Sequence, residues 1–227
     1  KKEMKQFICF NYALYKDSPY AVPELYTDVR DTLDPNKNAA FEFCEAQPFI
    51  ALRDGMVVGR IVAIINHKAN SVWNKKAVRF GWVDFIDDVE VVDALFATLE
   101  QWGRERGMTE AHGPLGFTDF DPEGMLVEGF DRIGTMATIY NYPYYPVHLE
   151  RMGYVKDVDW MEYLLTAPEA LPEKHARITR IVKEKYGLRV VKYTSHSKLA
   201  RERGVAIFEL LNEAYADLYG FSALSPK

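Results

Sequence analysis

The chain has 227 residues, of which 48% are hydrophobic and 27% charged, and its formal net charge is −5 at pH 7. A chain of this length and composition can bury one sizeable hydrophobic core, or one domain and part of a second. The acidic balance argues against a nucleic-acid or anionic-membrane surface, since both need clustered Lys and Arg, and neither partner is expected.

The cysteine content and the chain start bear on the compartment. Cys9 and Cys44 stand in apolar surroundings, which favours buried free thiols in a reducing cytoplasm and leaves a disulfide as the alternative. No apolar stretch approaches the roughly 18 residues of a membrane span, and the first residues lack the apolar segment of a signal peptide. The thiols and the lack of a signal peptide together predict a cytoplasmic protein. Because the chain begins at Lys1 rather than Met, we expect it to be a piece of a longer protein.

The first part of the chain predicts two helices and a hairpin. Apolar side chains at helical spacing predict a helix over residues 3–15, and a shorter helix is expected at 25–33 within a turn-rich stretch. Residues 49–65 form the clearest hairpin, because Asp54-Gly55 supplies the positive φ values of a tight turn between apolar strands.

The middle of the chain predicts a strand, a helix and a further strand. Residues 79–86 are interpreted as a buried strand, and Asp87 with Glu90 as a capping box that opens the next helix. Gly107 is expected to end that helix. The elements expected next are a strand at 109–113, a loop at 114–136, a helix at 143–152 and a strand at 154–165.

The pattern then starts again. A helix is expected at 171–186, a strand at 188–193 and a long helix at 195–219. Because helix and strand patterns begin again there, residues 167–227 are interpreted as a connecting helix and the start of a second, truncated unit.

Three segments carry a resemblance to a known family. They are GPLGFTDFDPEGMLVEGFD from Gly113, YNYPYY from Tyr140 and MGY from Met152. Together with the element order, they resemble bacterial proteins of the acyl-CoA N-acyltransferase (GNAT) family. The resemblance implies an α/β fold, with a mixed, mostly antiparallel sheet flanked by helices, over residues 1–166. It leaves open whether the first strand of that fold is present.

The same resemblance implies a function. The parent protein is expected to be an acyl-CoA-dependent N-acyltransferase that uses acetyl-CoA or another acyl-CoA and acts on a small-molecule amine. Members of the group are longer, so a second acyltransferase-like half of the same chain is an expected partner. Two alternatives stay open: a catalytically silent half that acts as scaffold or substrate platform, and a ligand- or partner-binding module.

The family's cofactor site only partly matches this sequence. Family members bind acyl-CoA through strand backbone, and the positions that correspond here are Val83, Asp84 and Phe85. They bind its pyrophosphate through a glycine-containing loop at the next helix start. In this chain that loop has no glycine and holds Asp87, Asp88 and Glu90, which would repel a pyrophosphate. We therefore expect this half not to bind CoA in the usual way.

The catalytic candidates are two histidines and a tyrosine. Family members often place a Tyr four residues before the Gly that corresponds to Gly153, to protonate the leaving thiolate, but this chain has Leu149 there. Tyr145 lies one helical turn further back. His148 on the same helix and His112 on the preceding strand could act as bases. The alternative for each is a surface residue or a satisfied structural one.

The substrate-binding candidates are Asp119, Tyr140 and Tyr142. The tyrosines could line a pocket, or could simply pack a helix on the sheet. Asp119 could orient an amine, because an amine acceptor must be held and deprotonated. No metal site is expected, since residues 121–124 have the pattern of a type I turn rather than of a cation loop.

Overall fold

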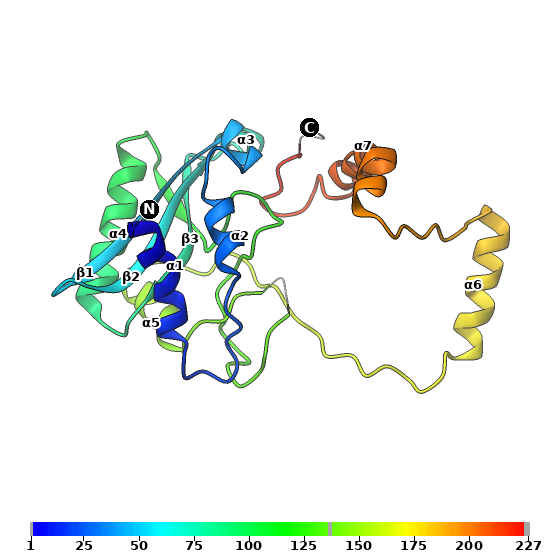
Figure 1. The fold of residues 1–227 in the computed structure, drawn as a ribbon, viewed down its shortest axis with the longest axis horizontal. Helices are drawn as coiled ribbons and strands as arrows, with labels where there is room; N and C mark the ends of the chain where they lie inside the picture. The colour runs from blue at the N-terminus through cyan, green and yellow to red at the C-terminus, as the bar shows by residue number, and fades with distance from the viewer. Residues whose placement is uncertain (1, 136–137, 225–227) are drawn as a thin grey trace. The chain divides into compact units, whose positions relative to one another are not determined.

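The computed structural model describes residues 2–135 and 138–224 (Figure 1). The chain divides into two compact units, one of Lys1–Asp157 with Tyr215–Ala223 and one of Val158–Ala214 with Leu224–Lys227. The helices and strands are α1 (Lys2–Leu14), α2 (Tyr26–Thr32), the 3-10 helix η1 (Ala39–Glu42), β1 (Cys44–Arg53), β2 (Met56–Asn66), α3 (His67–Val72), β3 (Ala77–Phe85), α4 (Val89–Arg104), β4 (Glu110–His112), α5 (Tyr144–Arg151), α6 (Glu173–Tyr186) and α7 (His196–Ala214).

The first unit contains a four-stranded sheet in the order β1-β2-β3-β4. The pairs β1–β2 and β2–β3 are antiparallel, whereas β3 and β4 are parallel. The predicted hairpin is confirmed, with Asp54 at φ 49° and Gly55 at φ 78° in its turn. The fold is thus α/β with a mixed, mostly antiparallel sheet, as the resemblance implies.

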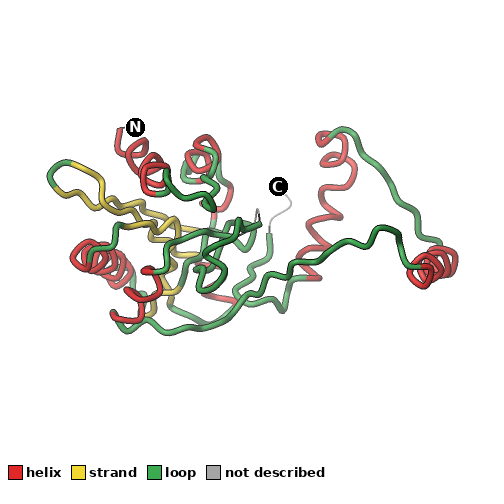
Figure 2. Tube along the Cα trace, turned by 90° about the horizontal axis from the view of Figure 1, so that it is seen from below, coloured by secondary structure: helices red, strands yellow, loops and turns green. Residues whose placement is uncertain are grey.

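Helices cover both faces of this sheet (Figure 2). On one face α4 and α5 pack on the apolar side chains of β2 and β3, among them Ile61, Phe80 and Phe85. On the other face α1 and α2 pack against Val62 and Ile64. Two separate cores therefore lie on opposite sides of β2, whose consecutive residues alternate between them.

A bulge in β3 changes which side chains face each core. Asp84 lies opposite Arg60 and Gly81 opposite Val62, so Trp82 and Val83 together face one residue of β2. Trp82 takes the extra position with a φ of 44°, a left-handed conformation that costs a non-glycine residue about 1 kcal/mol or more. After the bulge Asp84 points to the α1 side of the sheet.

Two predicted strands are wrong. Residues 154–165 and 188–193 belong to the described part of the chain and contain no strand. The charged middle of the first and the exposure of Val155, Leu164 and Leu165 leave it without a packed face, and a strand also needs a partner for its backbone groups. In the second segment Val190 and Val191 are exposed in the same way.

The second unit has two helices. Gly187 ends α6 with a φ of 60°, a left-handed C-cap that glycine adopts without strain. Neither α6 nor α7 has a buried residue, so the apolar side chains of both are open to contact.

Candidate functional site

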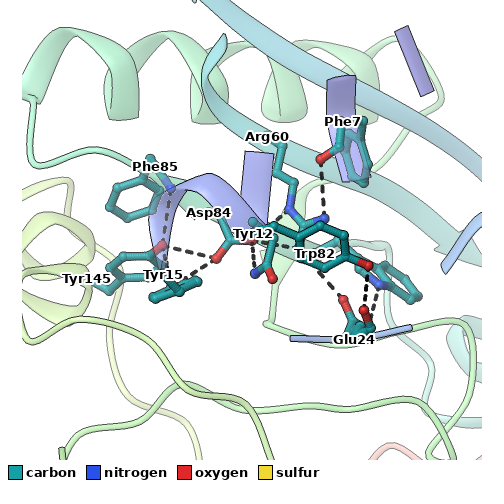
Figure 3. A network of polar contacts seen from close by, with 10 residues as sticks. Phe7, Tyr12, Tyr15, Glu24, Arg60, Trp82, Asp84, Phe85 and Tyr145 are labelled. Atoms are coloured by element: carbon teal, nitrogen blue, oxygen red, sulfur yellow. Dashed lines mark hydrogen bonds and ion pairs between the residues drawn. The ribbon is translucent and has the colours of Figure 1, made fainter. Parts of the chain in front are cut away.

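A buried carboxylate joins four elements of the first unit (Figure 3). Arg60 on β2 contacts Oδ2 of Asp84 through Nε and an Nη, each at 2.6 Å. Asn11 on α1 donates to the same oxygen at 3.0 Å, and the hydroxyls of Tyr15 and Tyr145 lie 3.0 and 3.1 Å from Oδ1. Asp84 is therefore fully paired.

The two tyrosines of this network stay neutral. Burial, and then the charge of Asp84, raises the pKa of both Tyr15 and Tyr145 far above the usual value of a phenol. Tyr145 also accepts a hydrogen bond of 3.2 Å from the Phe85 amide, and only 1% of it is exposed. These contacts make it a positioning residue that ties α5 to β3, and its predicted catalytic role stays a prediction.

The predicted cofactor positions lie beside this network. The Phe85 carbonyl accepts a hydrogen bond of 2.8 Å from Tyr144, and its amide is bound by Tyr145, so α5 already satisfies both groups. Val83 packs in the core on the α4 side, whereas Asp84 points to the α1 side. A pantetheine arm at Phe85 would have to displace tyrosine hydroxyls.

Tyr140 and Tyr142 gather next to Tyr15. The rings of Tyr15 and Tyr142 lie 5.0 Å apart, and that of Tyr140 meets Tyr15 edge-on at 5.8 Å. The Tyr140 hydroxyl donates to the backbone carbonyl of Phe130, and the Tyr142 hydroxyl donates to that of Leu14. The arrangement brings Tyr140, Tyr142 and Tyr145 together. It is compatible both with tyrosines that line a pocket and with tyrosines that pack a helix on the sheet.

His148 pairs with Asp87 at the end of β3. Its Nε2 lies 2.7 Å from a carboxylate oxygen of Asp87, while its Nδ1 is buried without a hydrogen-bond partner. His148 therefore links α5 to the segment that precedes α4.

The start of α4 is capped by the protein itself. Asp88, not Asp87 as predicted, is the N-cap residue, and it accepts a hydrogen bond from the Val91 amide. Glu90 does not reach back to the cap: its carboxylate contacts Arg53, which also binds Asp88 at 2.7 Å. The Arg53 hydrogen bond lowers the pKa of Asp88 to about 2. These residues do not fit a pyrophosphate, because a fixed carboxylate occupies the helix end.

A second polar cluster lies where β3 and β4 part. The strands pair only from Ala77↔Glu110 to Arg79↔His112, after which the chain turns away and Leu115 donates to the Phe80 carbonyl at 2.8 Å. We call this region the β3–β4 fork and define it by Arg79, His112, Asp119, Asp121, Glu123 and Tyr219.

Arg79 is the buried centre of the fork. Its guanidinium donates to the carbonyls of Gly116 and Gly220 at 3.3 and 3.1 Å. The carboxylates of Asp119, Asp121 and Glu123 are near enough for their charges to act on it. One cation thus faces three carboxylates.

Burial is the main influence on the pKa values of these three carboxylates. Burial raises the pKa of Asp119 and of Asp121, against the attraction of Arg79. Burial and the charge of Asp119 raise the pKa of Glu123 to about 7. Glu123 is therefore poised to exchange a proton near neutral pH.

His112 bounds the fork on the β4 side. Its Nε2 lies 2.8 Å from the Tyr219 hydroxyl and 3.5 Å from Asp157. Burial lowers the pKa of His112, so the ring is neutral at pH 7. The fork brings together the predicted residues His112 and Asp119, away from the Asp84 network that holds Tyr145.

Several residues of both clusters escaped the sequence reasoning. Arg60 and Arg79 carried a usable signal, since a charge inside an apolar strand has to be paired. Glu123 lies in a stretch whose pattern predicts a turn, and Tyr15 and Tyr219 give no signal because they come from distant parts of the chain. In the described residues, no three His, Cys, Asp or Glu converge closely enough to hold a metal ion.

Comparison with known proteins gives two relatives. The chain is 30% identical to protein YghO of Escherichia coli (strain K12) over 226 residues, which cover 97% of this chain and 56% of YghO. It is also 30% identical to the bacterial ceramide synthase of Caulobacter vibrioides (strain NA1000 / CB15N) over 222 residues, which cover 97% of this chain and 57% of that protein. The chain thus spans little more than half the length of each relative.

No family model matches the chain, and no solved structure matches it. Over the described residues, no helix has both the length and the apolar character required to cross a membrane.

Proposed function

We propose that the protein containing this chain is an N-acyltransferase that joins an acyl group to the nitrogen of an amine. The observation that carries the proposal is the 30% identity to a bacterial ceramide synthase over 97% of this chain. A ceramide is an amide of a long-chain amino alcohol, so the acceptor proposed here is an amine of that kind. The acyl donor proposed is acetyl-CoA or another acyl-CoA.

The β3–β4 fork has the charges that an amine acceptor needs. At neutral pH an amine arrives as an ammonium ion, and it must lose a proton before its nitrogen can attack. Asp119 and Glu123 supply negative charge beyond what Arg79 offsets. A bound ammonium would restore the balance, which gives this site a reason to select a cation.

Glu123 is the proposed base. Its carboxylate takes one proton from the ammonium, and the freed nitrogen forms a bond to the carbonyl carbon of the acyl donor. The bond from that carbon to sulfur then breaks, and the second proton of the nitrogen passes to the departing sulfur, so that an amide and a thiol are released. A pKa of about 7 leaves about half of the carboxylate ionised at neutral pH, and that matches the task of a base better than an ordinary Glu. Asp119 holds the ammonium, and His112 with Tyr219 closes the side of the site.

The donor has no place at the start of α4. Asp88 and Arg53 occupy the helix end at which the family would bind a pyrophosphate, so we propose that the donor is bound elsewhere in the whole protein. This same observation favours a second candidate function, in which this half is silent and only presents the amine to another half.

The test is an assay of the complete protein with a long-chain amino alcohol and a series of acyl-CoA donors, with the amide detected by mass spectrometry. Glu123→Gln should lower kcat by about 100-fold or more, the usual contribution of a general base. Glu128→Gln, an exposed Glu on the same loop, is the matched control and should leave kcat unchanged. Amide formation that is insensitive to Glu123→Gln would assign the chemistry to another half, and no amide from any donor would refute acyl transfer.

A further inference from the structure

The basic residues of this acidic chain are unevenly distributed. Helix α6 carries two Glu and five basic residues, Lys174, Arg177, Arg180, Lys183 and Lys185, and so has a net charge of +3 where the whole chain has −5. Arg189 and Lys192 follow directly. The whole-chain charge, from which no membrane partner is expected, conceals this local excess.

The same helix has an exposed apolar stripe. Ile178, Ile181, Val182 and Tyr186 follow the spacing of one helix face, and their exposed fractions are 45, 50, 37 and 62%. An isolated helix of 14 residues is only marginally stable in water, so its apolar stripe requires a cover.

The stripe continues into a groove. Beside α6, residues 188–190 enclose an open volume of about 510 Å³ whose apolar lining is Ile178, Val182, Leu188 and Val190. Lys183 and Arg189 line the same groove. An apolar floor beside two cations suits a molecule with hydrocarbon chains and a negatively charged head.

We infer that α6 and residues 188–192 form a docking surface for an anionic phospholipid bilayer. An excess of basic residues, an apolar stripe and low overall hydrophobicity are features of helices that lie in a membrane interface. The helix would place its apolar stripe among the acyl chains, and its basic residues would contact lipid phosphates and carboxylates.

Charge argues against a second copy of this chain as the molecule that covers the apolar stripe of α6. In a two-fold dimer the same surface would face itself, and each cluster of Lys and Arg would meet its own like charges. A nucleic acid would satisfy the basic residues and leave Ile178, Ile181 and Val190 in water. The bilayer satisfies both features at once, and this inference does not depend on the acyl-transfer proposal.

The experiment is sedimentation of the complete protein with vesicles of phosphatidylcholine alone and of phosphatidylcholine with 30% phosphatidylserine. We expect the protein to bind only to the anionic vesicles, and we expect this binding to weaken in high salt. Each basic residue near such a surface contributes on the order of five-fold to partitioning, so the double variant Lys183→Glu/Arg189→Glu should lose roughly 25-fold or more.

Matched variants separate charge from fold. Lys2→Glu/Lys5→Glu makes the same charge change at exposed positions of α1 and should bind within about two-fold of wild type. Ile181→Ser/Val182→Ser should weaken binding even in low salt. Glu123→Gln should bind vesicles like wild type, so failure of either proposal can be recognised separately.

Three results would overturn the inference. The first is no binding to anionic vesicles, and the second is equal loss in the α6 and α1 double variants. The third is strong protection of the α6 amides from hydrogen exchange without vesicles, since this would mean that protein already covers the stripe, whether a second copy or another part of the same chain.

Discussion

Glu123→Gln should stabilise the protein, and only above the ordinary pKa of a Glu. Burial and the charge of Asp119 raise the pKa of Glu123 from 4.5 to about 7. Between these values the folded chain keeps a proton that the unfolded chain has released, so the free energy of unfolding falls as the pH rises from 4.5 to 7. Gln mimics the protonated carboxyl and removes this loss.

The magnitude follows from the shift. At about 1.4 kcal/mol per pKa unit, the raised pKa of Glu123 corresponds to about 3 kcal/mol in the free energy of unfolding. Because Glu123 is partly exposed, solvent screening reduces the expected gain to about 1 to 2 kcal/mol. Urea denaturation followed by circular dichroism at pH 5 and pH 8 measures it, with Glu128→Gln as control. The gain should be small at pH 5 and reach its full size at pH 8. An equal effect of Glu123→Gln at both pH values would contradict the charge imbalance of the fork.

Three further changes test other parts of the first unit. Asp84→Asn leaves the buried Arg60 with only Glu24, at 3.7 Å, as a charged partner and should cost about 3 to 5 kcal/mol in urea denaturation; a loss below 1 kcal/mol would mean that water or Glu24 takes the place of the lost carboxylate. Gly81→Ala places a methyl group 2.6 Å from the Leu115 carbonyl and should lower the melting temperature clearly, unless the loop yields without strain. Asp88→Ala removes the cap of α4 and should lower the melting temperature at pH 7; the difference should vanish as the pH falls towards 2, where Asp88 itself is protonated.

The sequence predicts elements best where a local signal is strong. The hairpin is correct because Asp54-Gly55 fixes its turn, and α4 is correct because one apolar stripe runs along it. The capping residue is one position away from the prediction, since Asp87 and Asp88 are chemically alike and only the backbone geometry distinguishes them. The strand expected at 154–165 fails because a strand depends on a neighbour that the sequence cannot specify.

The bulge in β3 conceals the role of the Asp84 side chain, although the apolar pattern of the strand is clear in the sequence. Val78 and Phe80 face one core, and so do Val83 and Phe85, although strict alternation would send the second pair to the opposite side. The extra residue between the two pairs is visible in the sequence, and it is what places Asp84 opposite Arg60 on the α1 side. Asp84 was predicted as strand backbone, and its side-chain role follows only from this shift.

The fork could be predicted only in part. The sequence predicts His112 on the strand before the glycine-containing loop and Asp119 within that loop. In the structure His112 pairs with Arg79 across β3 and β4, and the charge of Arg79 acts on Asp119. Tyr219 comes from a segment 107 residues after His112 and could not be foreseen. Glu123 acquires its unusual acidity from burial, which a sequence does not state.

Arg60 and Arg79 lie on neighbouring strands of one sheet, and their partners differ in a way that separates structure from function. Arg60 binds Asp84 at 2.6 Å and contacts Glu24 at 3.7 Å, and the remaining lone pairs of Asp84 are filled by Asn11 and two tyrosines, so Asp84 is fully paired. Arg79 donates to two backbone carbonyls and faces three carboxylates that it does not neutralise. A partly buried site with excess negative charge is unfavourable in the free protein, and a bound cation would relieve it. That contrast is why the proposed amine is assigned to the fork and the Asp84 network to holding the sheet and helices in place.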